Sequence, residues 1–401
     1  MENEQKYWFM IEPYVYIHLT ENQVILYNTL DYASIESSRM EVVGLMRELL
    51  REENVGVVSL DASYMERSVP IKSFVEEVRE KFMGDIVDQA LSNRKPVQIL
   101  PFINYPVWEE KGCDLNFLED WSQILSEVTV HIDQTVNMDL LVNYLRTIPG
   151  NVAFILKADW RENLNIDLLL ESLKDRSVSI TIDSSYQCIP VIERTYASDF
   201  IYRVSVAFPI DHSAWEAVVR KEQALGHSFN YFFKITSEAD YQVAEQLIET
   251  YPIGNYQLDP VYTGQNLDFF QENIFLTHED ILASSLSMKE LFRKRTINQN
   301  DFGKLHILPN GDIRANLHHP VLGNITTYSI YEIIQKEIKE GKSWLRIRNQ
   351  SPCNTCLYRD LCPSPSDHEL EIGYPNLCWI SKHLSLIHIS EPTRHEQISY
   401  A

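Results

Sequence analysis

The chain has 401 residues, of which 44% are hydrophobic and 23% charged, and its 57 acidic against 35 basic side chains give a formal net charge of −22. This composition is that of a globular protein large enough for two or three domains, and it excludes collagen-like, disordered and disulfide-dense chains. The acidic balance argues against a nucleic-acid partner, because affinity for nucleic acid comes largely from Lys and Arg side chains that replace counterions.

The first residues, MENEQKYWFMIEPY, lack the basic start and long apolar core of a signal peptide. No window of the sequence reaches the ~18 apolar residues of a membrane span. We therefore expect a cytoplasmic protein with no membrane partner. Thiols stay reduced in that compartment, so clustered cysteines indicate metal binding more than disulfides.

Residues 1–92 are expected to form a small α+β module of winged-helix character. The segments YVYIHL and VILYNTL alternate as strands do and flank a polar ENQ turn, which predicts a β-hairpin. A helix is expected from about Met40 to Arg51 and a strand from Val55 to Leu60. The segment IKSFVEEVREKFMGDIVDQAL carries apolar residues at helical spacing and predicts a further helix.

Residues 93–299 alternate short β-rich runs with amphipathic helices such as NMDLLVNYLRTI and ADYQVAEQLIETY. The strand candidates begin at Val97, Val128, Val152, Val178, Tyr202 and Tyr231. This alternation favours a parallel sheet with crossover helices, most simply a full or partial (β/α) barrel. A flavodoxin-like open sheet is the competing topology.

The alternation stops near residue 300. KLHILPNGDIRANL predicts a hairpin that turns at Pro309, Asn310 and Gly311, and SIYEIIQKEIKEG predicts a helix that ends at Gly341. The last seventeen residues, 385–401, resemble the translated read-through of a sequencing adapter, with a genuine disordered tail as the alternative. We leave them out of the functional interpretation.

Four of the six cysteines fall within residues 353–378 and form the strongest functional signal. Cys353 and Cys356 have the CxxC spacing at which two thiolates can bind one ion, Cys362 follows after five residues and Cys378 after fifteen more. Four thiolates suit tetrahedral zinc or a four-iron (4Fe–4S) cluster equally well by count, so the spacing does not choose between them. The isolated Cys113 and Cys188 are expected to be ordinary cysteines.

The order of these features carries a resemblance. A hairpin with LPNGD, then LGNI, a short helix and CxxCxxxxxC with a trailing cysteine resembles the SPASM domain that follows the barrel in radical SAM peptide maturases. The ending LCPSPSDHELEIGYPNLC resembles pseudo-radical-SAM proteins of Bacteroidales peptide-modification systems. The specific likeness covers residues 300–380. It implies a radical-SAM-like barrel over residues 93–299 and an N-terminal module that recognises a precursor peptide.

Two departures from that family bear on activity. The segment from Val128 to Leu145, where the resemblance places CxxxCxxC, contains no cysteine, and Lys157 to Asp159 replaces the family's GGE. The residues after the hairpin, Arg314 to Asn316, also lack the cysteine of a complete SPASM domain. The resemblance therefore implies one remaining metal centre on Cys353, Cys356, Cys362 and Cys378, and no binding of S-adenosylmethionine for radical chemistry.

Three hypotheses follow. The first is a catalytically silent radical-SAM-like protein that binds a precursor peptide, an active maturase, or both. The second is an enzyme with non-radical chemistry at the strand ends, whose candidate carboxylates are Asp133, Asp159, Asp183 and Asp211. Convergence of two of these carboxylates with a basic partner in one pocket would favour it, although Asp211 is also typical of a helix N-cap. The third is a zinc-stabilised scaffold.

Overall fold

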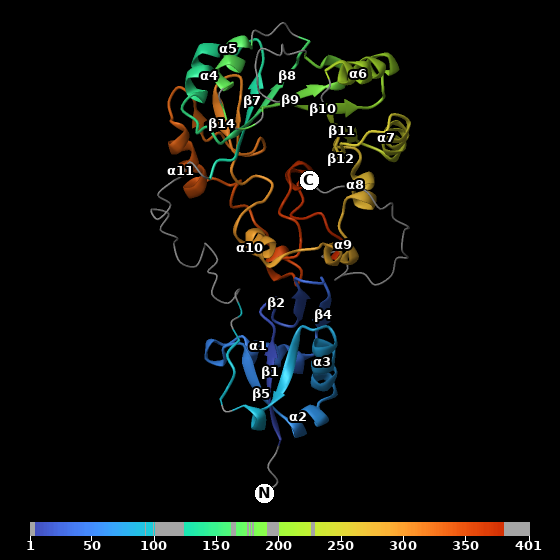
Figure 1. Cartoon of the computed structure of the whole chain (residues 1–401), viewed down its shortest axis with the longest axis vertical. Helices are drawn as coiled ribbons and strands as arrows, with labels where there is room; N and C mark the ends of the chain where they lie inside the picture. Colours follow the sequence, from blue (N-terminus) through green and yellow to red (C-terminus); the bar gives the residue numbers. More distant parts are fainter. Residues whose placement is uncertain are drawn as a thin grey trace.

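The computed structural model describes residues 5–92, 94–98, 100, 124–161, 166–174, 176, 178, 180–190, 200–225 and 229–380. The molecule is elongated, with the N-terminal α+β unit at one end and a large sheet at the other (Figure 1). The cysteine segment and two short helices, α9 (His278–Leu282) and α10 (Met288–Thr296), lie between them. None of the helices in the described ranges is long and apolar enough to cross a membrane.

The N-terminal unit contains two three-stranded antiparallel sheets, ordered β5-β1-β6 and β2-β3-β4. The predicted hairpin is confirmed, because β2 and β3 pair with Tyr16 opposite Tyr27. The strands are β1 (Lys6–Ile11), β2 (Val15–Leu19), β3 (Val24–Asn28), β4 (Ser34–Ser37), β5 (Val57–Asp61) and β6 (Gly84–Asp88). The helices are α1 (Met40–Leu49), α2 (Ala62–Arg67) and α3 (Val69–Glu80).

The helix expected over residues 71–91 is wrong in its second half. Helix α3 ends at Glu80, Phe82 takes a left-handed backbone conformation with φ of 53°, and β6 follows. A Cβ at Gly84 would lie 2.3 Å from the carbonyl oxygen of Met10, so β6 can pair with β1 because residue 84 is glycine. Helical spacing alone did not reveal this change from helix to strand.

The second part of the chain forms a nine-stranded sheet in the order β12-β11-β10-β9-β8-β7-β13-β14-β15. Strands β7 to β12 are parallel and consecutive, and β13 adds in parallel beside β7. The expected full barrel is not formed by the described strands, because β12 and β15 end the sheet without pairing to each other. Strands β7 to β12 add in one direction and β13 is placed on the other side of β7, so the described strands form an open sheet, as expected for the competing topology.

The bounds agree with most of the predicted strands. They are β7 (Glu127–Ile132), β8 (Ala153–Ala158), β9 (Ile180–Ser185), β10 (Ile201–Ala207), β11 (Phe229–Ile235), β12 (Tyr256–Pro260), β13 (Lys304–Ile307), β14 (Asp312–Arg314) and β15 (Gly323–Asn324). The sequence analysis missed β12. The strand expected at Val97 falls largely on residues outside the described ranges, as do Cys113 and the tail 385–401.

Helices pack on one face of this sheet. They are α4 (Met138–Leu145), α5 (Asp167–Leu173), α6 (His212–Leu225) and α7 (Glu238–Thr250), with α8 (Leu267–Asn273), α11 (Ile330–Glu340) and α12 (Asp367–Ile372) toward the cysteine segment. Alternate strand residues such as Val130, Leu156 and Val204 are buried in one core with these helices. The predicted hairpin is confirmed as β13–β14, and the predicted helix ending at Gly341 as α11.

Candidate metal centre

The cysteine segment begins in a tight turn. Cys353 opens a short 3₁₀ turn, Cys353–Thr355, and the backbone N–H of Cys356 donates to the Cys353 carbonyl at 3.0 Å. Pro352 precedes Cys353 and Pro363 follows Cys362. Proline cannot extend a helix because it lacks the N–H donor. Cys353 and Cys356 therefore belong to a single turn, as the CxxC spacing predicts.

The structure brings the four predicted ligands to one cavity. Its lining includes Cys353, Cys356, Cys362 and Cys378 together with Arg348, Arg359 and Asn376. Cys353 and Cys362 are each only 8% exposed. Four cysteines from a loop-rich segment thus line the same space, including Cys378 from a distant part of the segment. Their role as metal ligands stays a prediction.

Cys378, the most distant of the four in sequence, is held in place by backbone pairing. Leu276 donates its N–H to the Leu377 carbonyl at 2.9 Å, and Trp379 donates to the Leu276 carbonyl at 2.9 Å. This short bridge follows helix α8 and fixes Cys378 beside the cavity. No local sequence signal indicates the pairing, because it joins segments about 100 residues apart.

The donor chemistry of this cavity fits a thiolate-bound metal, whereas its dimensions do not select one. The space among the side chains is about 20 Å³, which is room for about one water molecule. Among the described residues, no group of three or more His, Cys, Asp or Glu side chains is positioned to hold a metal ion. Binding a single ion therefore requires the thiols to rotate inward, and binding a four-iron cluster requires the loops to move apart.

Burial and the Arg348 guanidinium set the electrostatics of the thiols. Burial raises the pKa of Cys353 and Cys362, and raises the pKa of Cys356 to about 11, so ionisation needs a compensating cation. The Arg348 guanidinium lowers all three pKa values in part and lies 3.9 Å from Cys353 Sγ. Arg348 also forms a buried 2.8 Å ion pair with Glu369.

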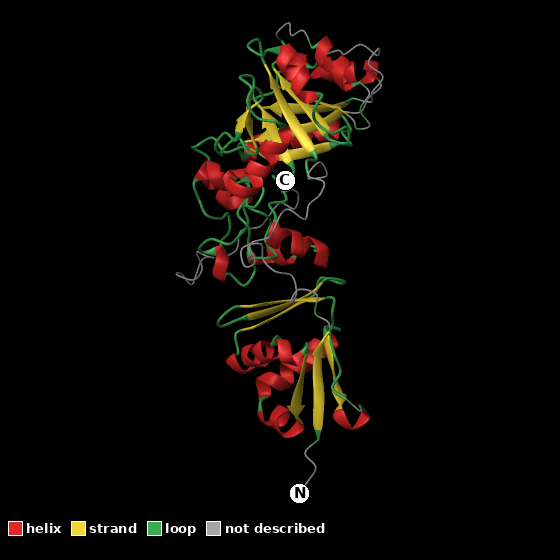
Figure 2. Cartoon of the chain, turned by 90° about the vertical axis from the view of Figure 1, so that its left-hand side faces the viewer, coloured by secondary structure: helices red, strands yellow, loops and turns green. Residues whose placement is uncertain are grey.

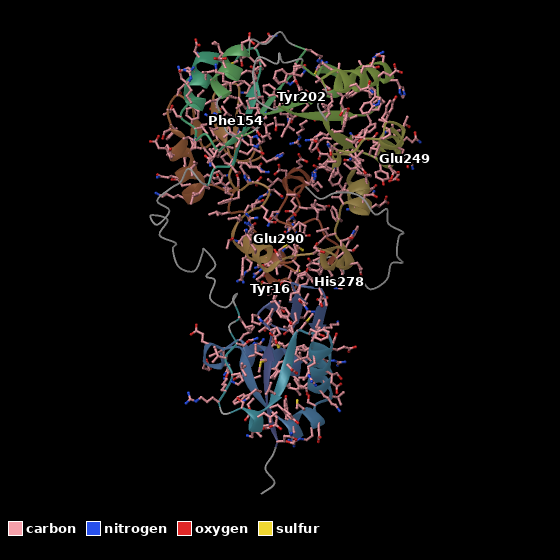
Figure 3. The ribbon with its side chains drawn as sticks, viewed as in Figure 1. Tyr16, Phe154, Tyr202, Glu249, His278 and Glu290 are labelled. Carbon is pink, nitrogen blue, oxygen red and sulfur yellow. The ribbon has the colours of Figure 1, made fainter. Side chains whose placement is uncertain are left out.

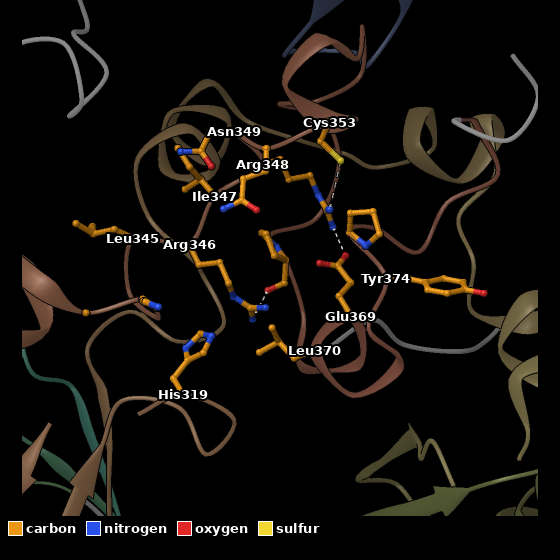
Figure 4. A pocket seen from close by; sticks show the side chains of 15 residues that line it. His319, Leu345, Arg346, Ile347, Arg348, Asn349, Cys353, Glu369, Leu370 and Tyr374 are labelled. Carbon is orange, nitrogen blue, oxygen red and sulfur yellow. Dashed lines mark hydrogen bonds and ion pairs between the residues drawn. The ribbon is translucent and has the colours of Figure 1, made fainter. Parts of the chain in front are cut away.

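A larger cavity adjoins the thiol cavity and was not predicted from the sequence. It measures about 520 Å³ and shares Arg348 and Cys353 with the thiol cavity (Figure 4). Arg346 lines it and interacts with Asp301 and Asp367, at 3.5 and 3.6 Å. The alternation of basic and apolar residues in LRIRNQ is the only sequence signal for it, and such a pattern is common in surface strands.

The N-terminal unit packs directly on the cysteine segment. Tyr16, which lies where the N-terminal unit meets the rest of the molecule (Figure 3), donates its hydroxyl proton to a carboxylate oxygen of Asp360 at 2.5 Å. His18 Nδ1 lies 2.9 Å from the Leu357 carbonyl. Tyr358 donates to Glu36 at 2.6 Å. Leu357, Leu361 and Cys362 belong to the same apolar core as β2, β3 and α1. Strand β3 is buried at all five positions, because α1 and α3 pack on one side of its sheet and α9, α10 and the cysteine segment on the other (Figure 2).

The four candidate carboxylates at the strand ends do not all converge. Asp133 and Asp159 line one open cavity of about 470 Å³ with Lys157, Arg161 and His131. Asp159 is paired with Arg161 at 2.7 Å, and this contact lowers the pKa of Asp159 to about 2.

The other two carboxylates lie apart from that cavity. Asp183 is 8% exposed and lies 4.0 Å from Arg203. Asp211 accepts the backbone N–H groups of Ser213 and Ala214 at the start of α6, which confirms it as an N-cap.

A scan against protein-family models matches none, and a search among curated proteins finds no similar sequence. The site is therefore interpreted from its own geometry and from the resemblance of its motifs.

Proposed function

We propose that this protein is a catalytically silent relative of the radical SAM peptide maturases that binds a precursor peptide, an active maturase, or both, during ribosomal peptide modification. The single observation that carries the proposal is the placement of cysteine. Four thiols line one cavity in the segment on which the N-terminal unit packs, whereas the chain from Val128 to Leu145, which covers most of β7 and all of α4, contains no cysteine.

The metal centre is proposed to hold the cysteine segment together. When bound, a 4Fe–4S cluster or a zinc ion would supply the positive charge that four thiolates need, and zinc with four protein ligands leaves no open coordination position. The resemblance favours the cluster, and the cavity dimensions do not choose between the two. Arg348 and Arg359 would balance part of the thiolate charge, while Asn376 places its side-chain amide 3.7 Å from Cys353 Sγ.

The docking of the N-terminal unit supports a binding role more than a catalytic one. Tyr16, His18 and Glu36 connect the peptide-recognition candidate to the cysteine segment through side chains. If the cysteine segment loses its folded structure, residues 5–92 therefore lose the surface on which they pack. A protein that only presents a peptide needs such a rigid support and no reaction centre.

Anaerobic purification followed by metal analysis is the first test. A brown protein containing iron and sulfide would identify the cluster, and a colourless protein with one zinc per chain would identify zinc. Cys356→Ser is expected to lose most of the metal, whereas the matched control Cys188→Ser is expected to retain it. Equal metal content in both variants would contradict the assignment of the thiol cavity.

The same preparation tests catalytic silence. After reconstitution with iron and sulfide, we expect no 5′-deoxyadenosine from S-adenosylmethionine under reducing conditions, with an active radical SAM enzyme as the positive control. Reductive formation of 5′-deoxyadenosine that survives in Cys356→Ser would reveal an initiating cluster elsewhere and defeat the proposal.

An enzyme with non-radical chemistry is the second candidate, and the cavity that holds Asp133, Asp159 and Lys157 favours it. Two observations rank it lower. Arg161 holds the pKa of Asp159 at about 2, far below the range of an efficient general base near neutral pH, and Asp133 accepts hydrogen bonds from Thr135. A change in mass of a precursor peptide incubated with this protein alone would favour the enzyme.

A further inference from the structure

Three loops of the N-terminal unit meet at one surface. The Tyr14 hydroxyl donates to the Phe82 carbonyl at 2.5 Å, Thr29 donates its N–H to the Tyr14 carbonyl at 3.2 Å, and Glu12 donates its N–H to the Met83 carbonyl at 2.9 Å. These bonds join the loop before β2, the loop after β3 and the loop after α3. The surface they form, which we call the aromatic patch, consists of Tyr14, Leu30, Tyr32 and Phe82.

The aromatic patch exposes large apolar side chains that contribute little to the folded core. Phe82 is 75% exposed, Leu30 is 67% exposed and Tyr32 is 43% exposed. Exposed apolar residues are common singly, but these three stand on loops that are hydrogen-bonded to one another. Burial in this chain therefore does not explain why the side chains at these positions are large.

The backbone conformation is a second indication that the large side chains of the aromatic patch do not serve the fold. Tyr32 and Phe82 both have left-handed φ values, 66° and 53°, which a bulky residue adopts at a cost of about 1 kcal/mol relative to glycine. Phe82 follows the end of α3, where the N–H of Met83 donates to the Val78 carbonyl at 2.8 Å. This is a helix ending at which glycine is the usual residue. Both positions carry an exposed ring where glycine would fold more easily.

The rim of the patch is acidic. Glu12 and Asp31 both raise the pKa of Tyr14, which places their carboxylates close to its ring. The Lys81 ammonium beside them is occupied by Glu77 and by the Ser34 carbonyl, each at 2.8 Å. A ligand of this surface therefore meets exposed aromatic rings next to two carboxylates that form no ion pair within the described part of the chain, which is the combination that attracts Lys and Arg side chains.

We propose that the aromatic patch binds a short basic segment of a peptide, in which Lys or Arg side chains stand next to apolar ones. The inference rests on the proposed function for the peptide as partner, and it adds the chemistry of the recognised segment. A patch of a few side chains is too small for a stable interface between folded proteins, which buries about 800 Å² on each partner. A peptide fits it better than a folded enzyme.

The test uses the full chain and two fluorescein-labelled synthetic peptides, one of lysine and leucine and one with glutamate in place of lysine. We expect only the lysine peptide to bind, and Phe82→Gly and Tyr32→Gly each to weaken its binding about tenfold. The matched control is Leu140→Ser, a 44% exposed leucine on α4 far from the patch in sequence. It is expected to bind the peptide as the unaltered protein does.

Thermal unfolding separates recognition from folding. Glycine relieves the left-handed strain, so Phe82→Gly is expected to keep or raise the midpoint of unfolding. A fall in the midpoint would show that Phe82 serves the fold, and equal peptide binding by all variants would show attraction through net charge alone; either result overturns the inference. Metal content and the absence of 5′-deoxyadenosine do not depend on the patch, so the proposed function can stand if the patch fails.

Discussion

His131 and His306 face each other across the neighbouring strands β7 and β13, with 3.3 Å between His131 Nε2 and His306 Nδ1. Both imidazoles lie on the sheet face opposite the helices, because they alternate with the buried Val130 and Ile307. Burial, together with the nearby Lys157 ammonium, lowers the pKa of both histidines to about 4. Both rings are therefore neutral in the folded protein at neutral pH.

This pair predicts a loss of stability in mild acid. The unfolded chain has histidine pKa values of about 6.5, so it binds more protons than the folded chain between pH ~6.5 and ~4. The stabilisation is complete above that window and is lost as the pH falls through it. His306→Gln is expected to reduce this loss by at most about 3 kcal/mol, measured by urea unfolding at several pH values.

His318→Gln, on the exposed loop after β14, is the matched control for His306→Gln. An unchanged pH dependence in His306→Gln would show that other groups cause the acid sensitivity.

At the scale of elements, two glycines illustrate opposite demands on the backbone. Gly84 opens β6 against β1, and a Cβ there would also lie 2.9 Å from Val78 Cγ1. Gly44 lies within α1 with no atom within 4 Å of the added Cβ. We expect Gly84→Ala to lower the free energy of unfolding by about 1–3 kcal/mol, and Gly44→Ala to raise it by about 1 kcal/mol.

Urea unfolding of the two alanine variants at one pH provides the comparison. Since each variant adds the same methyl group, the difference between them isolates the local environment. Equal effects in the two proteins would mean that β6 does not pack on β1 as described.

The sequence predicts elements well where one periodicity dominates. The alternation in β10 and β11 and the helical pattern that ends at Gly341 correspond to the observed β10, β11 and α11. Strand β12 was missed because it is short, ends at Pro260 and carries Asp259, whose carboxylate pairs with Lys234 in the neighbouring strand. A half-buried charge pair of this kind is visible only once the strands are placed side by side.

The candidate site, too, could be predicted from the sequence only in part. Cysteine count and spacing were sufficient to predict four thiols that face one cavity. Arg348, Asn376 and the contact between Tyr16 and Asp360 could not be predicted, because each depends on segments brought together by the tertiary fold. Tyr16 and Asp360 are separated by 344 positions, and nothing local in either segment indicates the other.

At the scale of the whole molecule, metal loading and the N-terminal unit should be linked. Metal binding that orders the cysteine segment contributes free energy of folding to whatever packs on that segment, and β2 and β3 do so. After chelation, we expect backbone amides of β2 and β3 to exchange with deuterium about tenfold faster or more, while those of β10 and β11 keep their rates. Unchanged exchange in β2 and β3 would contradict the linkage.

The shared core around β3 has a consequence for dividing the chain. A fragment that stopped at residue 92 would expose Tyr16, Ile17 and Tyr27, which are at most 5% exposed in the intact protein. A fragment that began after that residue would leave Leu357 and Leu361 uncovered. Fusing either fragment to another protein would leave this apolar surface exposed to solvent and prone to aggregation. The two fragments therefore need to be co-expressed, or the exposed apolar residues need to be covered by another partner.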